Sequence, residues 1–375
     1  MDQRYHRQVR LPGFGQEAQR KLSRAGVIVI GAGGLGCPAL QYLAAAGVGR
    51  LGIVDDDVVS LENLHRQVLY KTGDIGKQKT VCAKTTLSAL NPEVQFDLYD
   101  TRLSNANAFG ILGSFDVVID GTDNFASRYM INDACVLMNK PLVYGSVSRY
   151  EGQVAVFDHS GGTDQPANYR DLFPEPPDKG EVLNCEETGV LGVLPGVIGT
   201  LQAAETLKLI TGIGKPLINR LFLYQALTGN TFEMEIIPDV THRSILPSSE
   251  EAFRNFDYEW FCHVADDPSV EIDSPEFEKM MGEGEIAVVD IRNHIMDPGF
   301  PESVHYYRIP FSSLQQDHKI LENEKKVVVV CQSGISSLEA VDILAARFGS
   351  SKKIYSLKNG FAGWIKYING KKNGA

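Results

Sequence analysis

The chain contains few cysteines, and none of them are closely spaced. Six cysteines are spread over 375 residues, and no Cys-x-x-Cys pair occurs. This spacing suits a reducing compartment, in which thiols serve as core residues or as reactive groups, rather than a disulfide framework. We therefore expect the protein to be cytoplasmic.

Long apolar runs and an excess of basic residues are also missing. The N-terminus has no apolar segment of the kind found in signal peptides. The most apolar stretch, 189–210, is interrupted by Pro195, Gln202, Glu205 and Lys208, which predicts a buried helix with its preceding loop rather than a membrane span. Lysine and arginine number 36 against 47 aspartates and glutamates, so the net charge is −11. This charge implies no basic face and argues against nucleic acid as the main partner.

Length and patterning divide the chain into two α/β domains joined by a connecting segment. A chain of 375 residues, 43% of them hydrophobic, can bury two separate cores. Strand and helix patterns alternate in residues 1–240 and again in 274–375. Residues 241–273 carry Pro, Ser, Asp and Glu without a clear period, which predicts a linker. Its aromatic part, 253–261, is expected to dock on a domain.

A glycine-rich loop between two apolar strands opens the first domain. The first strand is predicted at 25–31, a helix at about 35–46, and a second strand at 52–55 that ends in Asp55. This order and spacing predict a nucleotide-binding βαβ unit, in which Asp55 accepts hydrogen bonds from ribose hydroxyls. Taken alone, the fingerprint favours NAD or FAD. The glycines that let the backbone approach the nucleotide are Gly31, Gly33, Gly34 and Gly36.

Charged and amide side chains after the second strand favour a triphosphate over a dinucleotide. A hydride-transfer enzyme has no need for cations beside the adenosine site. Two cations and an amide can hold triphosphate oxygens and stabilise the departing pyrophosphate. The alternative is a solvated, charged helix start. The residues concerned are Asp55, Asp57, Asn63, Arg66, Gln67 and Lys79.

Another buried strand, predicted at 115–120, ends in a polar turn that contains Asp123 and Asn124. This turn is expected at the same edge of the sheet as the glycine loop. Asp123 is a candidate ligand for Mg²⁺ bound to the phosphates. It is also a candidate N-cap for the helix that follows, and the two roles are compatible.

These motifs, taken together and in this order, closely resemble the MoeB/ThiF family, the bacterial relatives of ubiquitin-activating enzymes. The resemblance covers nearly all of residues 1–237. It implies a Rossmann-like domain with a mixed sheet, which binds ATP and Mg²⁺ through Asp55, Asn63, Arg66, Lys79 and Asp123. It also implies a homodimer in which Arg7 reaches into the active site of the other subunit. Further matching segments are Arg4-Tyr-His-Arg7-Gln, Gly13-Phe-Gly-Gln-Glu, Asn184-Cys-Glu-Glu-Thr-Gly-Val190 and Leu223-Tyr-Gln-Ala-Leu227.

The resemblance further implies a reaction and its partner. Members adenylate the C-terminal Gly-Gly carboxylate of a ubiquitin-like sulfur carrier, similar to MoaD or ThiS. The pathway would be molybdenum cofactor biosynthesis, thiamine biosynthesis or another thiocarboxylate route. Relatives have a cysteine at the position of Cys185, which makes it either a second nucleophile that forms an acyl disulfide or thioester with the carrier, or a semi-exposed cysteine without a catalytic role. Cys37, Cys82 and Cys135 are expected in the core.

One departure from the family pattern concerns zinc. Many relatives hold a structural Zn²⁺ with two Cys-x-x-Cys pairs, but this chain has no cysteine at the corresponding segments, 168–171 and 238–243. Four thiolates cannot be assembled from them. No zinc is therefore expected, and the region is expected to be held by packing alone.

Cys331 is the second focus of the sequence. It lies between a run of four valines and a predicted amphipathic helix, where backbone N–H groups and a helix N-terminus can stabilise a thiolate. A buried structural cysteine is the alternative. The last hundred or so residues resemble the rhodanese-like (sulfurtransferase) family at 286–292, 299–310 and 359–364. The resemblance implies a persulfide on Cys331, supplied by a donor such as a cysteine desulfurase. Gln332 replaces the arginine of many members, which disfavours the dianion thiosulfate as donor.

Together the two resemblances predict a MoeB-type domain fused to a rhodanese domain, as in MoeZ-like proteins. The predicted function is ATP-dependent adenylation of a sulfur carrier, followed by sulfur transfer from Cys331. One alternative is an NAD(P)- or FAD-dependent oxidoreductase on the same fold, against which Arg66 and Lys79 count. The other is a non-catalytic scaffold that binds a ubiquitin-like protein, which the complete set of ATP-binding residues makes a poorer explanation.

Overall fold

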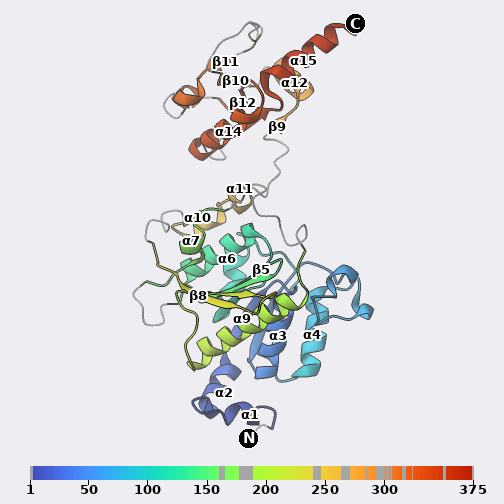
Figure 1. The fold of residues 1–375 in the computed structure, drawn as a ribbon, viewed down its shortest axis with the longest axis vertical. Coiled ribbons are helices and arrows are strands. Elements are labelled where there is room, and N and C mark those ends of the chain that lie inside the picture. The colour runs from blue at the N-terminus through green and yellow to red at the C-terminus, as the bar shows by residue number, and fades with distance from the viewer. Residues whose placement is uncertain are drawn as a thin grey trace. The chain divides into compact units, whose positions relative to one another are not determined.

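The computed structural model divides into two compact units, 1–264 and 265–375, which we describe separately (Figure 1). None of the described helices is long and apolar enough to cross a membrane. The residues described are 3–159, 165–176, 189–239, 246–262, 271–283, 286–292, 300, 304, 306–314, 318–322, 324–348 and 352–373.

The first unit is built on an eight-stranded mixed sheet of order β3-β2-β1-β4-β5-β6-β7-β8. Strands β1 to β5 pair in parallel, and β5 to β8 pair antiparallel. This arrangement confirms the predicted Rossmann-like fold class with a mixed sheet. The strands are β1 (Gly26–Ile30), β2 (Arg50–Val54), β3 (Gln95–Tyr99), β4 (Val117–Asp120), β5 (Leu142–Ser148), β6 (Glu151–Phe157), β7 (Arg220–Gln225) and β8 (Thr231–Glu235).

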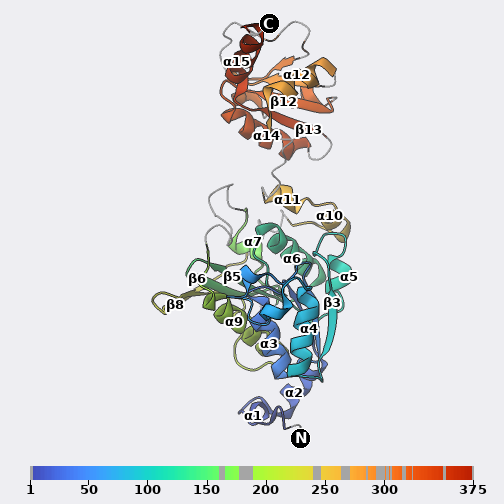
Figure 2. The same ribbon diagram turned by 90° about the vertical axis from the view of Figure 1, so that its right-hand side faces the viewer.

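Helices cover both faces of this sheet, so its central strands are buried on both sides (Figures 1 and 2). All five residues of β1 are buried. Val27 and Val29 contact one apolar layer and Ile28 and Ile30 the other, as expected for a strand whose side chains alternate between faces. The first layer contains α2 (Gly15–Arg24), α3 (Gly36–Ala46), α4 (Lys79–Leu90) and α9 (Val193–Thr211). The second contains α5 (Ala108–Leu112), α6 (Phe125–Met138), α7 (Tyr169–Leu172), α10 (Glu250–Arg254) and α11 (Tyr258–Phe261).

Three short helices complete the described first unit: α1 (His6–Val9) before α2, and the 3₁₀ helices η1 (Leu61–Asn63) and η2 (Thr72–Asp74) between β2 and α4. Helix α9 corresponds to the apolar stretch predicted as a buried helix, and that prediction is confirmed. Its residues pack against α3, β5 and β6. Cys37, Cys82 and Cys135 are buried, as predicted.

The aromatic segment of the predicted linker packs on the first unit, as expected. Phe253 is fully buried in the second apolar layer. Asn105 Nδ2 donates to the Phe253 carbonyl at 2.9 Å, and Arg254 Nη1 donates to the Ala106 carbonyl at 2.9 Å. Residues 246–262 of the predicted linker therefore belong structurally to the first unit, whereas 271–272 form a strand of the second.

The second unit is a five-stranded parallel sheet of order β11-β10-β12-β13-β9. One face packs against α14 (Ile335–Phe348), and the other against α12 (Ser274–Glu283) and α15 (Gly360–Asn373). The valines of β12 are buried on both faces, which explains their uninterrupted apolar sequence. The strands are β9 (Glu271–Ile272), β10 (Ala287–Asp290), β11 (Tyr306–Arg308), β12 (Lys326–Val330) and β13 (Lys353–Leu357). Two 3₁₀ helices, η4 (Phe311–Ser313) and η5 (His318–Leu321), precede β12.

Candidate active sites

A cavity of about 340 Å³ lies at the carboxyl ends of β1, β2 and β4. This is the edge at which the strand order reverses, and open α/β sheets bind their ligands there. The predicted nucleotide-binding residues meet in this cavity, with the exception of Gly36. Those that line it are Gly31, Gly33, Gly34, Asp55, Asp57, Asn63, Arg66, Gln67, Lys79, Asp123 and Asn124.

Two glycines are required by close backbone contacts in the loop. Gly31 has a φ of +89°, and a Cβ on it would lie 2.8 Å from the Gly121 carbonyl oxygen. A Cβ on Gly36 would lie 1.9 Å from the Gly31 carbonyl oxygen. Gly36 was predicted to approach the nucleotide, but it does not line the cavity. Its lack of a side chain instead lets α3 begin directly beneath the loop.

The Asp55 carboxylate is fixed in orientation by two backbone groups. Ala32 N–H donates to Oδ2 at 2.7 Å, and Asp57 N–H donates to Oδ1 at 2.9 Å. Burial raises the pKa of Asp55, although Lys79 and these N–H groups oppose the shift. The first N–H comes from the glycine loop, so Asp55 ties this loop to the end of β2. Its remaining lone pairs are available to hydroxyl donors.

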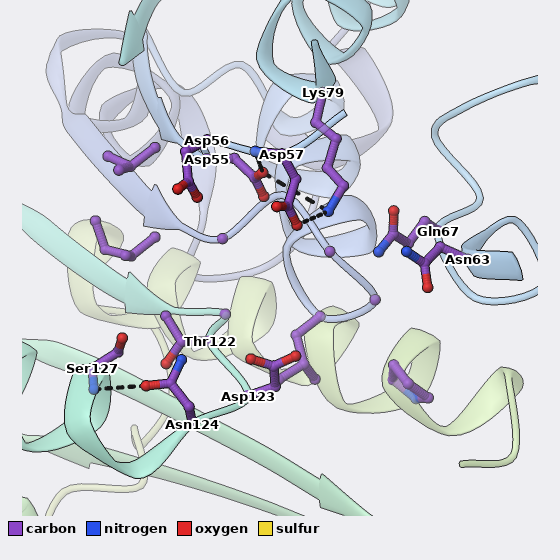
Figure 3. Close-up of a pocket in the computed structure, with 18 of the residues that line it drawn as sticks. Asp55, Asp56, Asp57, Asn63, Gln67, Lys79, Thr122, Asp123, Asn124 and Ser127 are labelled. Carbon is purple, nitrogen blue, oxygen red and sulfur yellow. Dashed lines mark hydrogen bonds and ion pairs between the residues drawn. The ribbon is translucent and has the colours of Figure 1, made fainter. Parts of the chain in front are cut away.

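Lys79 is the main cation of this wall, and Figure 3 shows its amine pointing at the aspartates that follow β2. Its side chain is only 4% exposed, and Nζ lies 2.7 Å from Asp57 Oδ2 and 3.8 Å from Asp55 Oδ1. A lysine at such burial requires charged partners. Lys79 is the first residue of α4, and its backbone N–H donates to the Asp57 carbonyl at 3.1 Å.

The opposite wall follows β4 and carries Thr122, Asp123, Asn124 and Ser127 (Figure 3). Asn124 caps α6, because its Oδ1 accepts from the Ser127 N–H at 2.9 Å. The suggested capping role of Asp123 is therefore wrong. The Asp123 carboxylate is exposed at the cavity instead.

The cavity has features that suit a phosphate-bearing ligand with a divalent cation. Asp55, Asp56 and Asp57 place carboxylate oxygens within 4.8 Å of one another, and Mg²⁺ binds through oxygen ligands. Gln67 is 4% exposed, and its Oε1 has no hydrogen-bond partner among the described residues. A buried amide oxygen without a partner is unfavourable unless a ligand or water satisfies it.

Sequence reasoning missed several residues of the cavity. Arg128 on α6 is one of them: burial raises the pKa of the nearby Asp120 carboxyl, and the buried Arg128 guanidinium opposes that shift without cancelling it. Thr101, Arg102 and Leu103 line the cavity directly after β3. The rule that ligands bind at the carboxyl ends of parallel strands, applied to the third strand, would have identified these three.

In the second unit, Cys331 lies directly after β12 and before α14. The Gly334 N–H donates to Sγ at 3.0 Å, and the Ser337 hydroxyl lies 3.3 Å from Sγ. Burial raises the pKa of the Cys331 thiol. The Ser337 hydroxyl and loop N–H groups outweigh burial, so the pKa lies below that of an ordinary cysteine. The loop is built to stabilise a thiolate.

The segment at 359–362 holds the cysteine loop in place. Phe361 N–H donates to the Cys331 carbonyl at 2.8 Å, and Ala362 N–H donates to the Gln332 carbonyl at 3.1 Å. A Cβ on Gly360 would lie 2.5 Å from the Cys331 carbonyl oxygen. This contact explains the glycine in the segment that resembles the rhodanese family.

Three further residues named in the sequence analysis remain: Arg7, Cys185 and Gln332. Arg7 is exposed on α1 and does not line the cavity. Cys185 lies outside the described residues. Gln332 is exposed beside Cys331.

The segment at 168–171 corresponds to one of the zinc-binding Cys-x-x-Cys pairs of many relatives. It was predicted to be held by packing alone, and this prediction is wrong because a buried ion pair also holds it. Arg170 is fully buried and forms a bidentate ion pair with Asp133, at 2.9 Å from Nε and 2.7 Å from Nη2. The Tyr258 hydroxyl donates to the same carboxylate at 2.8 Å. This Arg170–Asp133–Tyr258 network joins α7, α6 and α11.

The sequence model of the ThiF family matches residues 5–243, and that of the rhodanese-like domain matches residues 273–367. A Thermus thermophilus relative named sulfur carrier protein adenylyltransferase is 51% identical, over 69% of this chain and 96% of its own length. The probable adenylyltransferase/sulfurtransferase MoeZ of Mycobacterium tuberculosis is 39% identical over 97% of this chain and 93% of its own. The adenylyltransferase and sulfurtransferase MOCS3-1 of Zea mays is 41% identical over 94% and 79%.

Solved structures share the fold over part of this chain. The crystal structure of Escherichia coli MccB with ATP matches with a TM-score of 0.55 at 20% identity, over 64% of this chain and 73% of that chain. Adenylyltransferase and sulfurtransferase are the two activities in the names of the full-length relatives. The chain therefore belongs to the ThiF family and continues into a rhodanese-like domain.

Proposed function

We propose that this protein adenylates the C-terminal Gly-Gly carboxylate of a ubiquitin-like sulfur carrier, similar to MoaD or ThiS, and then converts it to a thiocarboxylate with sulfur from Cys331. The observation that carries the proposal is the buried Lys79, held by Asp55 and Asp57 beside the glycine loop and facing Asp123 across one cavity. In this proposal, residues 1–240 carry out adenylation and residues 274–375 carry out sulfur transfer. Residues 241–273 connect the two parts.

Each residue of the first site has a role that follows from its chemistry. Asp55 accepts from the ribose hydroxyls, and the loop N–H groups approach the phosphates. Asn63, Arg66, Gln67 and Lys79 hold phosphate oxygens, and Asn124 keeps its turn in shape by capping α6. Bound Mg²⁺, with Asp123 as a ligand, would neutralise charge on the phosphates.

In the first reaction, a carboxylate oxygen of the carrier attacks the α-phosphorus of ATP. The bond from this phosphorus to the bridging oxygen of pyrophosphate breaks, and pyrophosphate leaves. Arg66 and Lys79 stabilise the charge that develops on the leaving oxygens. The product is an acyl-adenylate, whose acyl carbon is open to nucleophiles because AMP is a good leaving group.

In the second reaction, the terminal sulfur of a Cys331 persulfide attacks the acyl carbon and AMP leaves. The resulting acyl disulfide is cleaved when a second thiol attacks Sγ of Cys331, which releases the carrier thiocarboxylate. Cys185 is the candidate for this thiol. The enzyme disulfide that remains is reduced by a thiol in solution, so the cycle needs a reducing compartment, the cytoplasm.

A homodimer is part of the proposal, because Arg7 does not line the cavity of its own chain. It would complete the site of the partner subunit. A dimer interface would also remove from water some of the apolar side chains of the first unit that are more than half exposed. They include Tyr42, Leu61, Val68 and Val193.

The sulfur donor is proposed to be a protein persulfide, such as that of a cysteine desulfurase. The loop stabilises Sγ with N–H groups and a hydroxyl, and Gln332 adds no charge to attract the dianion thiosulfate. We also propose that the chain needs no zinc, since Arg170 and Asp133 stabilise the segment at 168–171. Metal analysis of the purified protein tests this, and stoichiometric zinc would contradict it.

ATP–pyrophosphate exchange tests the adenylation step without the sulfur step. The purified chain is incubated with MgATP, labelled pyrophosphate and each member of a panel of Gly-Gly carriers. Exchange that depends on one carrier supports the proposal and names the pathway, whether molybdenum cofactor, thiamine or another. Carrier binding without exchange would favour a scaffold, and a change in reduced-cofactor absorbance would favour an oxidoreductase.

A further inference from the structure

Two buried serine hydroxyls lie behind the sulfur of Cys331. Ser337 belongs to the first turn of α14, and Ser356 to β13, the strand that pairs with β12. Both side chains are fully buried. The Ser356 hydroxyl lies 2.9 Å from the Ser337 hydroxyl, which in turn lies 3.3 Å from Cys331 Sγ. The three groups form a continuous chain from the sheet to the sulfur.

The direction of these hydrogen bonds follows from counting protons. A serine hydroxyl has one proton to donate and two lone pairs to accept with. Ser356 donates its proton to Ser337 Oγ. The proton of Ser337 is then left to donate, and Cys331 Sγ is within its reach. Once Cys331 is a thiolate it has no proton, so in the reactive anion the sulfur is the acceptor in this contact.

We propose that Ser356 and Ser337 form a hydroxyl relay that directs the Ser337 proton at Cys331 Sγ and so positions and stabilises the sulfur anion for sulfur transfer. This assignment rests on the proposed persulfide role of Cys331. Ser337 and Ser356 are positioning residues: Ser337 acts on the sulfur directly, and Ser356 acts through Ser337. Neither side chain gives up its proton.

The relay fits the sulfur-loading step with no additional reactant. The Cys331 thiolate attacks the terminal sulfur of the donor persulfide, and the donor's sulfur–sulfur bond breaks. The electron pair of that bond leaves with the donor thiolate, while Cys331 becomes the persulfide. Before attack the anionic charge sits on Sγ, where Ser337 O–H and Gly334 N–H donate to it. Hydrogen bonds to an anion are stronger than those to a neutral thiol.

Within the described part of the second unit, charged groups around the sulfur do not provide an alternative explanation. The neighbouring strand β10 ends in Asp290, and Arg292 forms a bidentate ion pair with it at 2.8 and 2.7 Å. The Arg292 guanidinium also lies over the Phe361 ring, 3.7 Å from its centroid. This pair is internally neutralised. The largest influences on the pKa of Cys331 are burial, the Ser337 hydroxyl and the loop N–H groups.

The test measures the alkylation rate of Cys331 in the full chain as a function of pH, without ATP or carrier. Iodoacetamide is the probe, and mass spectrometry of the Cys331 peptide gives its rate separately from other thiols. Ser337→Ala and Ser356→Ala are compared with Ser336→Ala, an exposed serine in the same turn. Circular dichroism confirms that each variant is folded.

Loss of one hydrogen bond to the anion raises the apparent pKa by about 1 unit, so alkylation of Ser337→Ala near neutral pH slows about tenfold. Ser356→Ala shifts the pH profile of Cys331 alkylation in the same direction by a smaller amount, and Ser336→Ala does not shift it. Ser337→Thr retains a hydroxyl and so returns the profile part of the way to that of the native chain. An unchanged profile in folded Ser337→Ala overturns the inference. An unchanged profile in Ser356→Ala overturns the relay. Because no sulfur is transferred in this assay, its failure is distinct from failure of the proposed function.

Discussion

Removing Arg170 is expected to destabilise the first unit strongly. Arg170 and Asp133 are both 0% exposed, so Arg170→Met leaves a buried carboxylate with only neutral donors, from Tyr258 and Asn132. Breaking a buried ion pair from one side costs about 3–5 kcal/mol of unfolding free energy. The guanidinium also loses its place against the Tyr129 and Phe261 rings, at 4.9 and 4.8 Å from their centroids.

Two further variants separate charge from packing. Tyr258→Phe removes one hydrogen bond to the carboxylate and should cost about 1.5–3 kcal/mol. The double variant Arg170→Met with Asp133→Leu replaces the whole pair by apolar side chains, and should be more stable than Arg170→Met alone because no buried charge remains.

The assay is hydrogen exchange with mass spectrometry over a urea series, using the full chain. Peptides from α6 report the first unit, and peptides from β12 report the second as an internal control. The reasoning is refuted if Arg170→Met lowers the unfolding free energy by less than about 1 kcal/mol, or if the double variant is less stable than Arg170→Met.

Three other predictions concern the two active sites. Lys79→Met should lower the rate of carrier-dependent ATP–pyrophosphate exchange by about 10²–10³-fold, because this is the usual effect of losing one preorganised group that stabilises developing charge. An unchanged rate would show that Lys79 takes no part in the reaction. Arg7→Ala and Lys79→Met should each be inactive alone, but mixing the two variants should restore part of the exchange activity. The reason is that a mixed dimer contains one site with both native residues. No recovery would place Arg7 in the site of its own subunit or outside the reaction. Iodoacetamide at neutral pH should modify Cys331 before Cys37 and Cys262, because hydrogen bonds lower the pKa of Cys331 whereas burial raises that of the other two to about 12. Thiolate appears only as pH rises through the pKa, so the reverse order would contradict the geometry of the Cys331 loop.

The nucleotide cavity could be predicted from the sequence because its residues follow strand ends. The carboxyl ends of neighbouring parallel strands lie at one edge of a sheet. The local motifs around Gly31, Asp55 and Asp123 were therefore sufficient to predict that these residues share one site. The same logic placed Cys331 at the end of β12. Gly36 was assigned to the cavity because the fingerprint does not distinguish a glycine that contacts ligand from one that contacts the loop.

Contacts between distant segments could not be predicted in this way. Arg170 and Asp133 are 37 residues apart, and Tyr258 and Asp133 are 125 apart. Each occurs alone in the sequence, without a period or motif that indicates its partner. The cap of α6 was ambiguous for a different reason: Asp123 and Asn124 are adjacent, and both residue types are favourable N-caps. Backbone geometry, with Asn124 in an extended conformation, decides between them.

The most direct test of the account is the mass of the carrier after a complete reaction. The full chain is incubated with MgATP, the carrier that supports exchange, a persulfide donor and a thiol reductant, and the carrier is analysed by mass spectrometry. We predict the mass increase that corresponds to one carboxylate oxygen replaced by sulfur, lost in Cys331→Ala while that variant still catalyses ATP–pyrophosphate exchange. An equal mass increase in Cys331→Ala, or none with the native chain despite exchange, would contradict sulfur transfer through Cys331.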